Sequence, residues 1–183
     1  APGGAGVVIG AGTTLAGLAA HPGIVRRYPL LCQAAELIAT PTLRRMGTVG
    51  GNLCQDTRCS FLDRSPLWRQ AAGYCMKADG DSCRVAPSGD RCWAAITSDL
   101  APVMVALGAS VRVVGPTGER LVPLEAFYRD DGMAHLCLAA AEILAEVRLP
   151  TPATAHTAYL KLRPRRAFDF PSLGVAAVLH LED

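Results

Sequence analysis

The first part of the chain shows helical spacing of its apolar residues. A short apolar run at residues 7–9 ends in Gly10-Ala11-Gly12, which we interpret as a tight turn from a strand into a helix. The spacing then predicts a helix over residues 15–20. Thr13 or Thr14 can cap this helix, because a threonine hydroxyl accepts a hydrogen bond from an amide of the first turn.

The pattern then changes twice. Helical spacing over residues 29–39 predicts a second helix, which ends before a proline. Residues 44–53 are rich in glycine and are predicted to form a loop. Residues 54–97 are polar and show no periodicity. A stretch of this length needs a source of order other than regular structure, and a metal centre would supply it.

Regular patterns return in the second half of the chain. We expect a helix over 98–107, a hairpin of strands 109–114 and 119–122, a short helix over 123–128, and strands at 141–149, 158–163 and 174–181. The strand at 158–163 is the expected partner of the strand at 141–149. Helices therefore come first and a meandering sheet follows, which predicts an α+β fold.

Composition and charge exclude several classes of function. Half of the 183 residues are apolar and 19% are charged, as in folded domains and unlike disordered chains. A net charge of +2, with few aromatic residues, does not indicate nucleic-acid binding. No apolar run is long enough to cross a bilayer, and no signal peptide is visible. We expect a cytoplasmic protein, of which this chain is a piece cut at both ends.

Seven cysteines without an export signal favour metal or redox chemistry over disulfides. The set of interest is Cys59, Cys75, Cys83 and Cys92. Its spacing matches neither a zinc finger nor a bacterial ferredoxin, so an iron–sulfur cluster, a zinc site and unligated thiols all stay open. Arg58, Lys77, Arg84 and Arg91 lie close to these cysteines in sequence, and such a cationic surround would suit an anionic cluster.

The other three cysteines are set apart from this set. Cys54 follows the glycine-rich segment directly and is expected to pack with it. Cys32 and Cys137 lie in apolar stretches that we interpret as helical, where a cysteine behaves as a small core residue. The four histidines are scattered and are expected to be structural or to lie on the surface.

Two glycine-rich segments were considered as phosphate sites. The first, Gly10-Ala11-Gly12, lacks the third glycine and the later acidic residue of a dinucleotide-binding fingerprint. The second, residues 48–52, has two adjacent glycines that would let a backbone approach a phosphate, flanked by Thr48 and Asn52. A simple turn is the alternative for this second segment.

Several motifs follow one another in the order of a known family. They are Ile9-Gly10-Ala11-Gly12-Thr13-Thr14-Leu15, Ala39-Thr40-Pro41-Thr42-Leu43-Arg44-Arg45-Met46-Gly47-Thr48-Val49-Gly50-Gly51-Asn52-Leu53, Ser98-Asp99-Leu100-Ala101-Pro102, Tyr159-Leu160-Lys161-Leu162-Arg163 and Asp169-Phe170-Pro171. This series resembles the FAD-binding subunit of the molybdenum hydroxylases, the family of the xanthine dehydrogenase and CO dehydrogenase medium subunits. The resemblance covers nearly the whole chain.

The cysteine-rich stretch is an insertion relative to most members of that family. It resembles the insertion of 4-hydroxybenzoyl-CoA reductase β subunits, which implies a [4Fe-4S] cluster on Cys59, Cys75, Cys83 and Cys92. The resemblance further implies a central FAD-binding domain over residues 1–150, with the cluster insertion at 53–97, and the start of a C-terminal lobe at 151–183.

The resemblance also implies which residues contact FAD. They are Ile38, Ala39, Leu43 and Gly47 along the flavin side, Thr48, Gly50, Gly51 and Asn52 at the pyrophosphate and ribityl chain, and Asp99, Leu144 and Lys161 at the flavin. Asp99 as the N-cap of a helix and Lys161 as a surface residue are the alternatives. A second glycine-rich loop of the family is not found in this chain, so we expect residues 1–183 alone to lack stoichiometric flavin.

The implied function is electron transfer within a molybdenum-containing 4-hydroxybenzoyl-CoA reductase, which removes an aromatic hydroxyl reductively. The partners would be a molybdopterin-binding large subunit, a [2Fe-2S] small subunit and a ferredoxin-like donor. No residue in this chain is expected to be catalytic. The alternatives are the FAD subunit of another molybdenum hydroxylase, acting on an aryl-CoA, a purine or CO, and a zinc-stabilised module without redox function.

Overall fold

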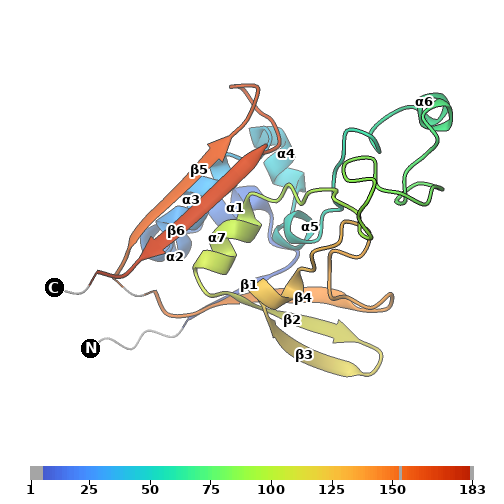
Figure 1. Ribbon diagram of the computed structural model, residues 1–183. Coiled ribbons are helices and arrows are strands. Elements are labelled where there is room, and N and C mark those ends of the chain that lie inside the picture. The colour runs from blue at the N-terminus through green and yellow to red at the C-terminus, as the bar shows by residue number, and fades with distance from the viewer. Residues whose placement is uncertain (1–5, 153, 182–183) are drawn as a thin grey trace. The chain divides into compact units, whose positions relative to one another are not determined.

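A computed structural model describes residues 6–152 and 154–181 of the chain. The chain divides into two compact units. Unit 1 comprises residues 1–54, 98–127 and 138–183, and unit 2 comprises residues 55–97 and 128–137. Regular secondary structure is concentrated in unit 1 (Figure 1).

Unit 1 contains a four-stranded antiparallel sheet. Its strands, in the order β1-β4-β2-β3, are β1 (Val7–Gly10), β4 (Ile143–Leu149), β2 (Ser110–Gly115) and β3 (Gly118–Pro123). The predicted hairpin is confirmed, with Val111 opposite Val122. The N-terminal apolar run is confirmed as strand β1, which forms an edge of this sheet.

The predicted partner of β4 was wrong. Strand β5 (His156–Leu162) pairs with β6 (Leu173–Leu179) in a separate two-stranded sheet, while β4 pairs with β1 and β2. The segment between β4 and β5 contains Pro150 and Pro152. A proline fixes φ, and it restricts the residue before it, so this segment does not form the tight turn of a hairpin.

Five short helices fill the N-terminal part of unit 1. They are α1 (Leu15–Ala20), α2 (Pro22–Arg27), α3 (Pro29–Glu36), α4 (Pro41–Met46) and α5 (Val49–Leu53). Helix α1 begins at the cap Thr14, whose hydroxyl accepts a hydrogen bond from Gly17 N at 3.0 Å, as predicted. Helices α2 and α3 both have proline at the first position, where its missing N–H has no cost.

The predicted helix over residues 15–20 is confirmed as α1, but α2, α4 and α5 were not predicted. His21, which follows α1 directly, caps α2 by accepting a hydrogen bond from Gly23 N. The predicted loop at 44–53 contains the end of α4 and the whole of α5. Both helices begin after a threonine, Thr40 and Thr48, whose hydroxyl accepts a hydrogen bond from an amide of the first turn. These caps offset the weak helix propensity of the two segments.

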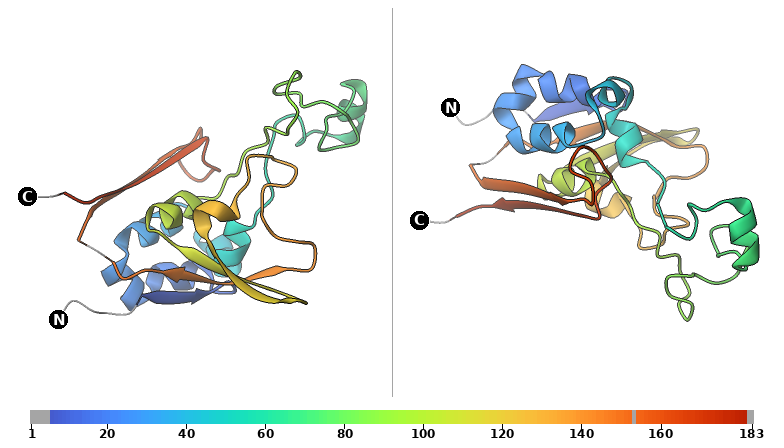
Figure 2. Two further views of the ribbon diagram at one scale, coloured as in Figure 1. Left: turned by 60° about the horizontal axis from the view of Figure 1, so that its bottom comes forward. Right: turned by 90° about the horizontal axis from the view of Figure 1, so that it is seen from above.

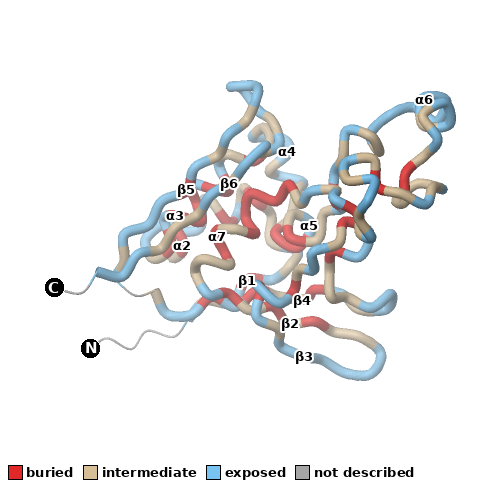
Figure 3. The backbone as a smooth tube through the Cα atoms, in the orientation of Figure 1, coloured by how far each residue is buried: buried red, intermediate tan, exposed pale blue. Residues whose placement is uncertain are grey.

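The helices lie between the four-stranded sheet and the β5–β6 hairpin (Figures 1 and 2). Helix α7 (Leu100–Ala106) packs against β6, and α8 (Leu124–Phe127) against β2 and β3. The buried side chains that form this core include Leu18, Leu31, Leu53, Leu100, Met104, Val111 and Phe127. Figure 3 shows buried backbone running through α3, α5 and α7.

Unit 2 is mostly irregular, as its lack of periodicity predicted. Its one helix among the described residues is α6 (Pro66–Ala71), which the sequence analysis missed. The cysteine-rich stretch is joined by residues 128–137, and the Thr57 hydroxyl donates to Gly132 O at 2.6 Å. Throughout the described part of the chain, no helix is long and apolar enough to cross a membrane.

Candidate functional site

The second glycine-rich segment forms the first turn of α5 and lies on the turn that follows β1. Gly50 N donates to Ala11 O at 2.8 Å, and Val49 N donates to Thr13 O at 2.9 Å. The Thr48 hydroxyl accepts from Gly51 N at 3.1 Å and so caps the helix. The two glycine-rich segments of the sequence therefore form one surface within unit 1.

The two glycines have different reasons to lack a side chain. A Cβ at Gly50 would lie 2.8 Å from the Cβ of Ala11, so the close packing of α5 on the β1 turn excludes any larger residue. Gly51 is exposed, and a Cβ there would meet only the Thr48 hydroxyl. The amides of residues 49–52 have acceptors within the chain. A phosphate at this loop would therefore take the Thr48 hydroxyl hydrogen or replace one of these bonds.

Asn52 connects α5 to the start of α7. Its Oδ1 accepts from the Ser98 hydroxyl at 2.7 Å and from Leu100 N at 3.2 Å. Ser98 Oγ in turn accepts from Ala101 N at 3.0 Å. Asn52 and Ser98 thus satisfy amides at the N-terminus of α7, which leaves the carboxylate of the neighbouring Asp99 for other partners.

Asp99 forms a buried group with two residues of β5. Tyr159 Oη donates to Asp99 Oδ1 at 2.6 Å, and Lys161 Nζ donates to Asp99 Oδ2 at 2.9 Å. The Asp99 side chain is 4% exposed and that of Lys161 is 2% exposed. Burial and then the carboxylate of Asp99 raise the pKa of Tyr159, so its hydroxyl stays protonated and donates.

This arrangement bears on the alternatives given for Asp99 and Lys161, whose contacts with FAD stay predictions. Asp99 occupies the N-cap position of α7 but its side chain makes no capping bond. The surface interpretation of Lys161 was also wrong, because its ammonium is buried. A charged pair out of water is costly unless each partner is well bonded, so unit 1 holds these charges at this point at a cost in stability.

The segment after α3 lies beside the same ammonium. Lys161 Nζ donates to Leu37 O at 3.0 Å, and Arg44 Nη1 donates to Ile38 O at 2.8 Å. Ala39 has a positive φ of 46°, an uncommon conformation for a residue with a side chain. The turn that contains Ile38 and Ala39 is therefore fixed by two cationic side chains.

The remaining predicted flavin residues lie on other elements of unit 1. Leu43 is exposed on α4, and Gly47 O, just past that helix, accepts from Leu15 N at 2.8 Å. Leu144 is buried in β4, opposite Val113 of β2. Their contacts with FAD stay predictions.

The four predicted cluster ligands all belong to unit 2. Cys75, Cys83 and Cys92 are buried, and Cys59 is half-buried. Burial raises the pKa of Cys83, but the amides of Trp93, Ala86 and Val85 lower it by more. Backbone amides around a sulfur stabilise a thiolate, the form that binds metals.

The arrangement of these thiols fits a metal centre only in part. Cys83 and Cys92 interact electrostatically, and Trp93 N lies 3.5 Å from Cys83 Sγ. Among the described residues, however, no three His, Cys, Asp or Glu side chains are placed to share a metal ion. The donor chemistry of unit 2 suits a cluster, whereas the full ligand set is not gathered.

The cationic surround expected for the cysteines is largely neutralised. Arg58 pairs with Asp63 at 3.2 Å, Lys77 with Asp56 at 2.6 Å, and Arg91 with Asp130. Arg84 donates to the backbone carbonyls of residues 73 and 74. Lys77 lowers the pKa of Cys92, where burial acts in the opposite direction and is the larger effect.

The cysteines outside the set behave differently. Burial raises the pKa of Cys54 to about 11. Cys54 belongs to unit 1, whereas the four proposed ligands belong to unit 2. Cys32 is buried on α3, as expected. Cys137 was expected on a helix, but it lies half-buried in an irregular segment where no helical stripe forms.

Sequence reasoning missed two parts of these sites. Tyr159 is two positions from Lys161, and residues with this spacing in a strand share a face, so the pattern alone could have placed them together. Residues 128–137 carry no comparable signal. Their association with the cysteine-rich stretch depends on bonds such as Cys92 N to Asp131 Oδ1 at 3.2 Å.

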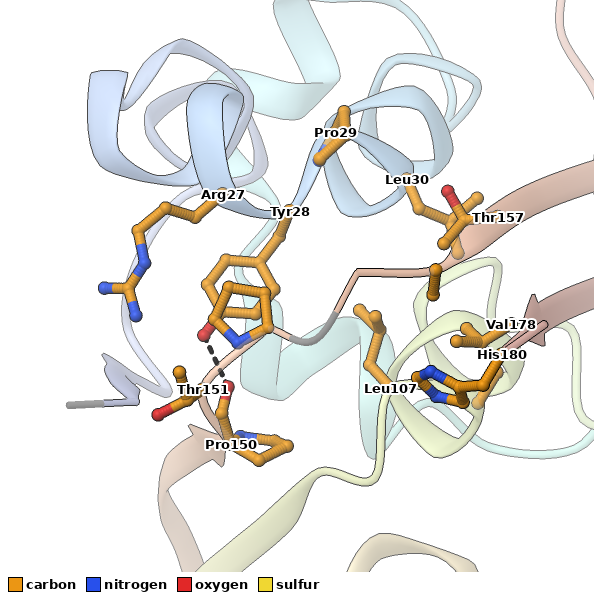
Figure 4. Close-up of a pocket in the computed structure, with 13 residues that line it drawn as sticks. Arg27, Tyr28, Pro29, Leu30, Leu107, Pro150, Thr151, Thr157, Val178 and His180 are labelled. Atoms are coloured by element: carbon orange, nitrogen blue, oxygen red, sulfur yellow. Dashed lines mark hydrogen bonds between the residues drawn. The ribbon is translucent and has the colours of Figure 1, made fainter. Parts of the chain in front are cut away.

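A cavity of about 230 Å³ lies elsewhere in unit 1, between α2, the end of α7 and the β5–β6 hairpin (Figure 4). At one side of this cavity the Tyr28 hydroxyl donates a hydrogen bond to Pro150 O at 2.6 Å. None of the predicted flavin or cluster residues lines this cavity.

Comparison with known proteins identifies an FAD-binding family. Residues 2–152 match the family described as "FAD binding domain in molybdopterin dehydrogenase". The chain is 33% identical to the aldehyde oxidoreductase FAD-binding subunit PaoB of Escherichia coli over 95% of its length and 58% of PaoB. It is 29% identical to the carbon monoxide dehydrogenase medium chain of Afipia carboxidovorans over 96% of its length and 47% of that chain.

Solved structures agree with this assignment. Reconstituted CO dehydrogenase from Oligotropha carboxidovorans matches with a TM-score of 0.70 and 26% identity, over 98% of this chain and 49% of that one. The chain thus spans about half the length of the curated relatives it matches. The mixed α/β fold of the CO dehydrogenase medium subunit is confirmed, and the chain belongs to the family of FAD-binding domains of molybdopterin dehydrogenases.

Proposed function

We propose that this chain is the FAD-binding part of an electron-transfer subunit in a molybdenum hydroxylase-type oxidoreductase, and that unit 2 holds a [4Fe-4S] cluster. The observation that carries the cluster proposal is the interior of unit 2. Its buried side chains, among the described residues, are three cysteines, two threonines and His135, with no buried aliphatic or aromatic residue. A unit of this size without an apolar core needs another source of order.

Two features of unit 1 support the flavin side of this proposal. The Asp99–Lys161 pair is buried next to the turn at 37–39, and charged groups at such depth are uncommon unless they serve a ligand or a structural network. Gly51 leaves an exposed backbone beside the Thr48 hydroxyl, where a pyrophosphate could approach closely. FAD would be held by Ala39, Leu43, Gly47, Thr48, Gly50, Gly51, Asn52, Asp99, Leu144 and Lys161.

When bound, FAD would transfer electrons singly or in pairs, and a cluster would transfer them singly. The residues of this chain bind and orient these groups, and none acts as a nucleophile or general base. The Thr48 hydroxyl would donate a hydrogen bond to a phosphate oxygen. The Lys161 ammonium donates two of its three hydrogens to Asp99 and Leu37 O, and the third would bond a polar atom of the flavin. Cys59, Cys75, Cys83 and Cys92 would bind iron as thiolates.

The family suggests partners and candidate substrates for this chain. We propose a molybdopterin-binding large subunit, a [2Fe-2S] small subunit and a ferredoxin-like donor or acceptor. A 4-hydroxybenzoyl-CoA reductase is the narrower hypothesis, supported by the spacing of the four cysteines alone. An aldehyde oxidoreductase is the second candidate, favoured by the 33% identity to PaoB, whose name states that activity.

Iron and acid-labile sulfide analysis of anaerobically purified protein tests the cluster directly. We expect about four irons and four sulfides per chain and a broad absorption near 400 nm, as cubane clusters show. A protein that contains one zinc ion per chain and neither iron nor sulfide would contradict the cluster proposal and leave the flavin proposal intact.

The flavin and the substrate need separate measurements. FAD released by acid from the assembled complex should equal this subunit in amount, and absence of flavin from that complex would contradict the proposed binding site. Turnover of the assembled complex with aromatic aldehydes and with 4-hydroxybenzoyl-CoA, each with a dye or ferredoxin, then decides between the two substrate classes.

A further inference from the structure

We propose that Tyr159 is a positioning residue for the flavin site, which holds the Asp99–Lys161 pair in the geometry that binds FAD. This inference rests on the proposed placement of FAD beside Asp99 and Lys161. The three side chains come from two elements, α7 and β5, and meet within the core of unit 1. Their hydrogen bonds show how one residue can orient the other two.

Asp99 would have two orientations available without Tyr159. At the N-cap position its carboxylate is close in sequence to the first-turn amides of α7, the usual partners of an aspartate there. Asn52 and Ser98 already satisfy two of these amides. The hydroxyl of Tyr159, at 2.6 Å from Oδ1, holds the carboxylate on the β5 side instead.

The hydrogen bonds leave capacity for a ligand. A carboxylate has about four lone-pair positions, and the described structure shows one donor on each oxygen of Asp99. An ammonium has three hydrogens, and Lys161 uses two of them on Asp99 and Leu37. Tyr159 thus fixes a donor and an acceptor, side by side, that both keep free capacity.

The hairpin is shaped around the Tyr159 ring. Gly174 of β6 lies opposite Lys161, and a Cβ there would come within 3.0 Å of Tyr159 Oη. An alanine at this position would displace the hydroxyl by a few tenths of an ångström without removing it. Gly174→Ala is therefore a second way to disturb the same bond.

Unit 1 offers a matched control residue. Tyr28 and Tyr159 are both 2% exposed, and each donates one hydrogen bond at 2.6 Å. Tyr28 donates to Pro150 O beside the cavity of Figure 4 and touches none of the proposed flavin residues. A Tyr→Phe change at each position removes the same atom from the same depth.

The experiment compares Tyr159→Phe, Gly174→Ala and Tyr28→Phe in the assembled protein, from which the flavin is first removed and to which FAD is then added back. FAD affinity is measured by fluorescence quenching, and the flavin midpoint potential by spectroelectrochemical titration. We expect the Kd for FAD to rise about tenfold in Tyr159→Phe, since a hydrogen bond to a charged group is lost, and the midpoint potential to shift. Gly174→Ala should change both in the same direction by less, and Tyr28→Phe should change neither.

Two results would overturn the inference, and they differ from each other. If Asp99→Asn weakens FAD binding while Tyr159→Phe behaves like Tyr28→Phe, Tyr159 is only a core residue and the flavin placement stands. If Asp99→Asn and Lys161→Met also leave affinity and potential unchanged, the flavin placement fails together with the inference. Thermal unfolding of each variant separates these effects from a loss of folding, and Gly174→Ala serves if Tyr159→Phe does not fold.

Discussion

The two units of this protein achieve order in different ways. Unit 1 buries leucine, valine and phenylalanine side chains between its sheets and helices, with Leu31, Val111 and Phe127 fully inaccessible. Unit 2 buries thiols, hydroxyls and an imidazole, and its backbone is held by side-chain bonds such as Thr57 to Gly132. The first pattern gives unit 1 an apolar core, whereas in the second the proposed metal centre would have to supply the order.

The largest expected effect comes from removing one proposed ligand. Cys83→Ser should abolish nearly all bound iron, because a three-thiolate set binds a cubane cluster poorly and Cys83 has the amide-stabilised sulfur. Iron analysis and the visible spectrum measure this loss. Cys54→Ser is the matched control and should keep its iron, because Cys54 belongs to unit 1 and is not one of the proposed ligands.

The same variant tests whether only unit 2 depends on the metal. Both tryptophans, Trp68 and Trp93, belong to unit 2, so their fluorescence reports on this unit alone. Far-UV circular dichroism reports mainly on unit 1, which has nearly all the helices and strands. Cys83→Ser should shift the fluorescence and leave the dichroism unchanged. Loss of both signals would refute the independence of the two units.

The next largest effect is expected from a substitution in the apolar core, which should lower the stability of unit 1. Leu31 is 0% exposed, and Leu31→Ala should lower the free energy of unfolding by about 2–5 kcal/mol through lost burial and a cavity. Leu67 of unit 2 is 76% exposed, and Leu67→Ala should change the free energy of unfolding by less than about 0.5 kcal/mol. Urea unfolding followed by dichroism and by tryptophan fluorescence measures the two changes. Equal effects would mean that the units share one core.

Lys77 should contribute an intermediate amount to unit 2. Its ammonium bonds Asp56, Gly132 O at 2.9 Å and the Thr57 hydroxyl, so it connects the two segments of the unit. Lys77→Met should reduce the stability of unit 2 by about 1–3 kcal/mol, because these acceptors lose a charged donor. Tryptophan fluorescence in urea reports the change. Arg129→Met, at an exposed cation in the same unit, should have little effect.

The smallest effect concerns an exposed ion pair of unit 1. Hydrogen bonds from Arg120 and then from the Ala139 amide lower the pKa of Glu142 to about 2. A folded pKa below the unfolded value of about 4.3 means that this stabilisation is present above pH 4.3 and is lost as the pH falls towards 2. Carboxyl chemical shifts measured against pH test this. In Arg120→Gln the Glu142 carboxyl should titrate close to pH 4. An unchanged pKa of Glu142 in this variant would show that the ion pair is not the cause of the shift.

Local features of the sequence predicted much of unit 1. The cap of α1, the β2–β3 hairpin, α7 and the last strand were found because caps, turns and apolar periodicity act between near neighbours. The helices at 22–27, 41–46 and 49–53 were missed because they are short, and the first and last also contain glycine, whose low helix propensity hides the cap before them. The cysteine set was found by composition, but its grouping with residues 128–137 was not.

The sequence by itself determined which chemical groups this protein has: a glycine-rich turn, four clustered cysteines, and an aspartate and a lysine in recognisable motifs. The tertiary structure alone decided that β4 pairs with β1 and β2, that Asp99 faces Tyr159 and Lys161, and that Asp131 bonds the Cys92 amide. These contacts join residues far apart in the chain. Their formation depends on chain closure and on the burial of whole faces, which no local pattern encodes.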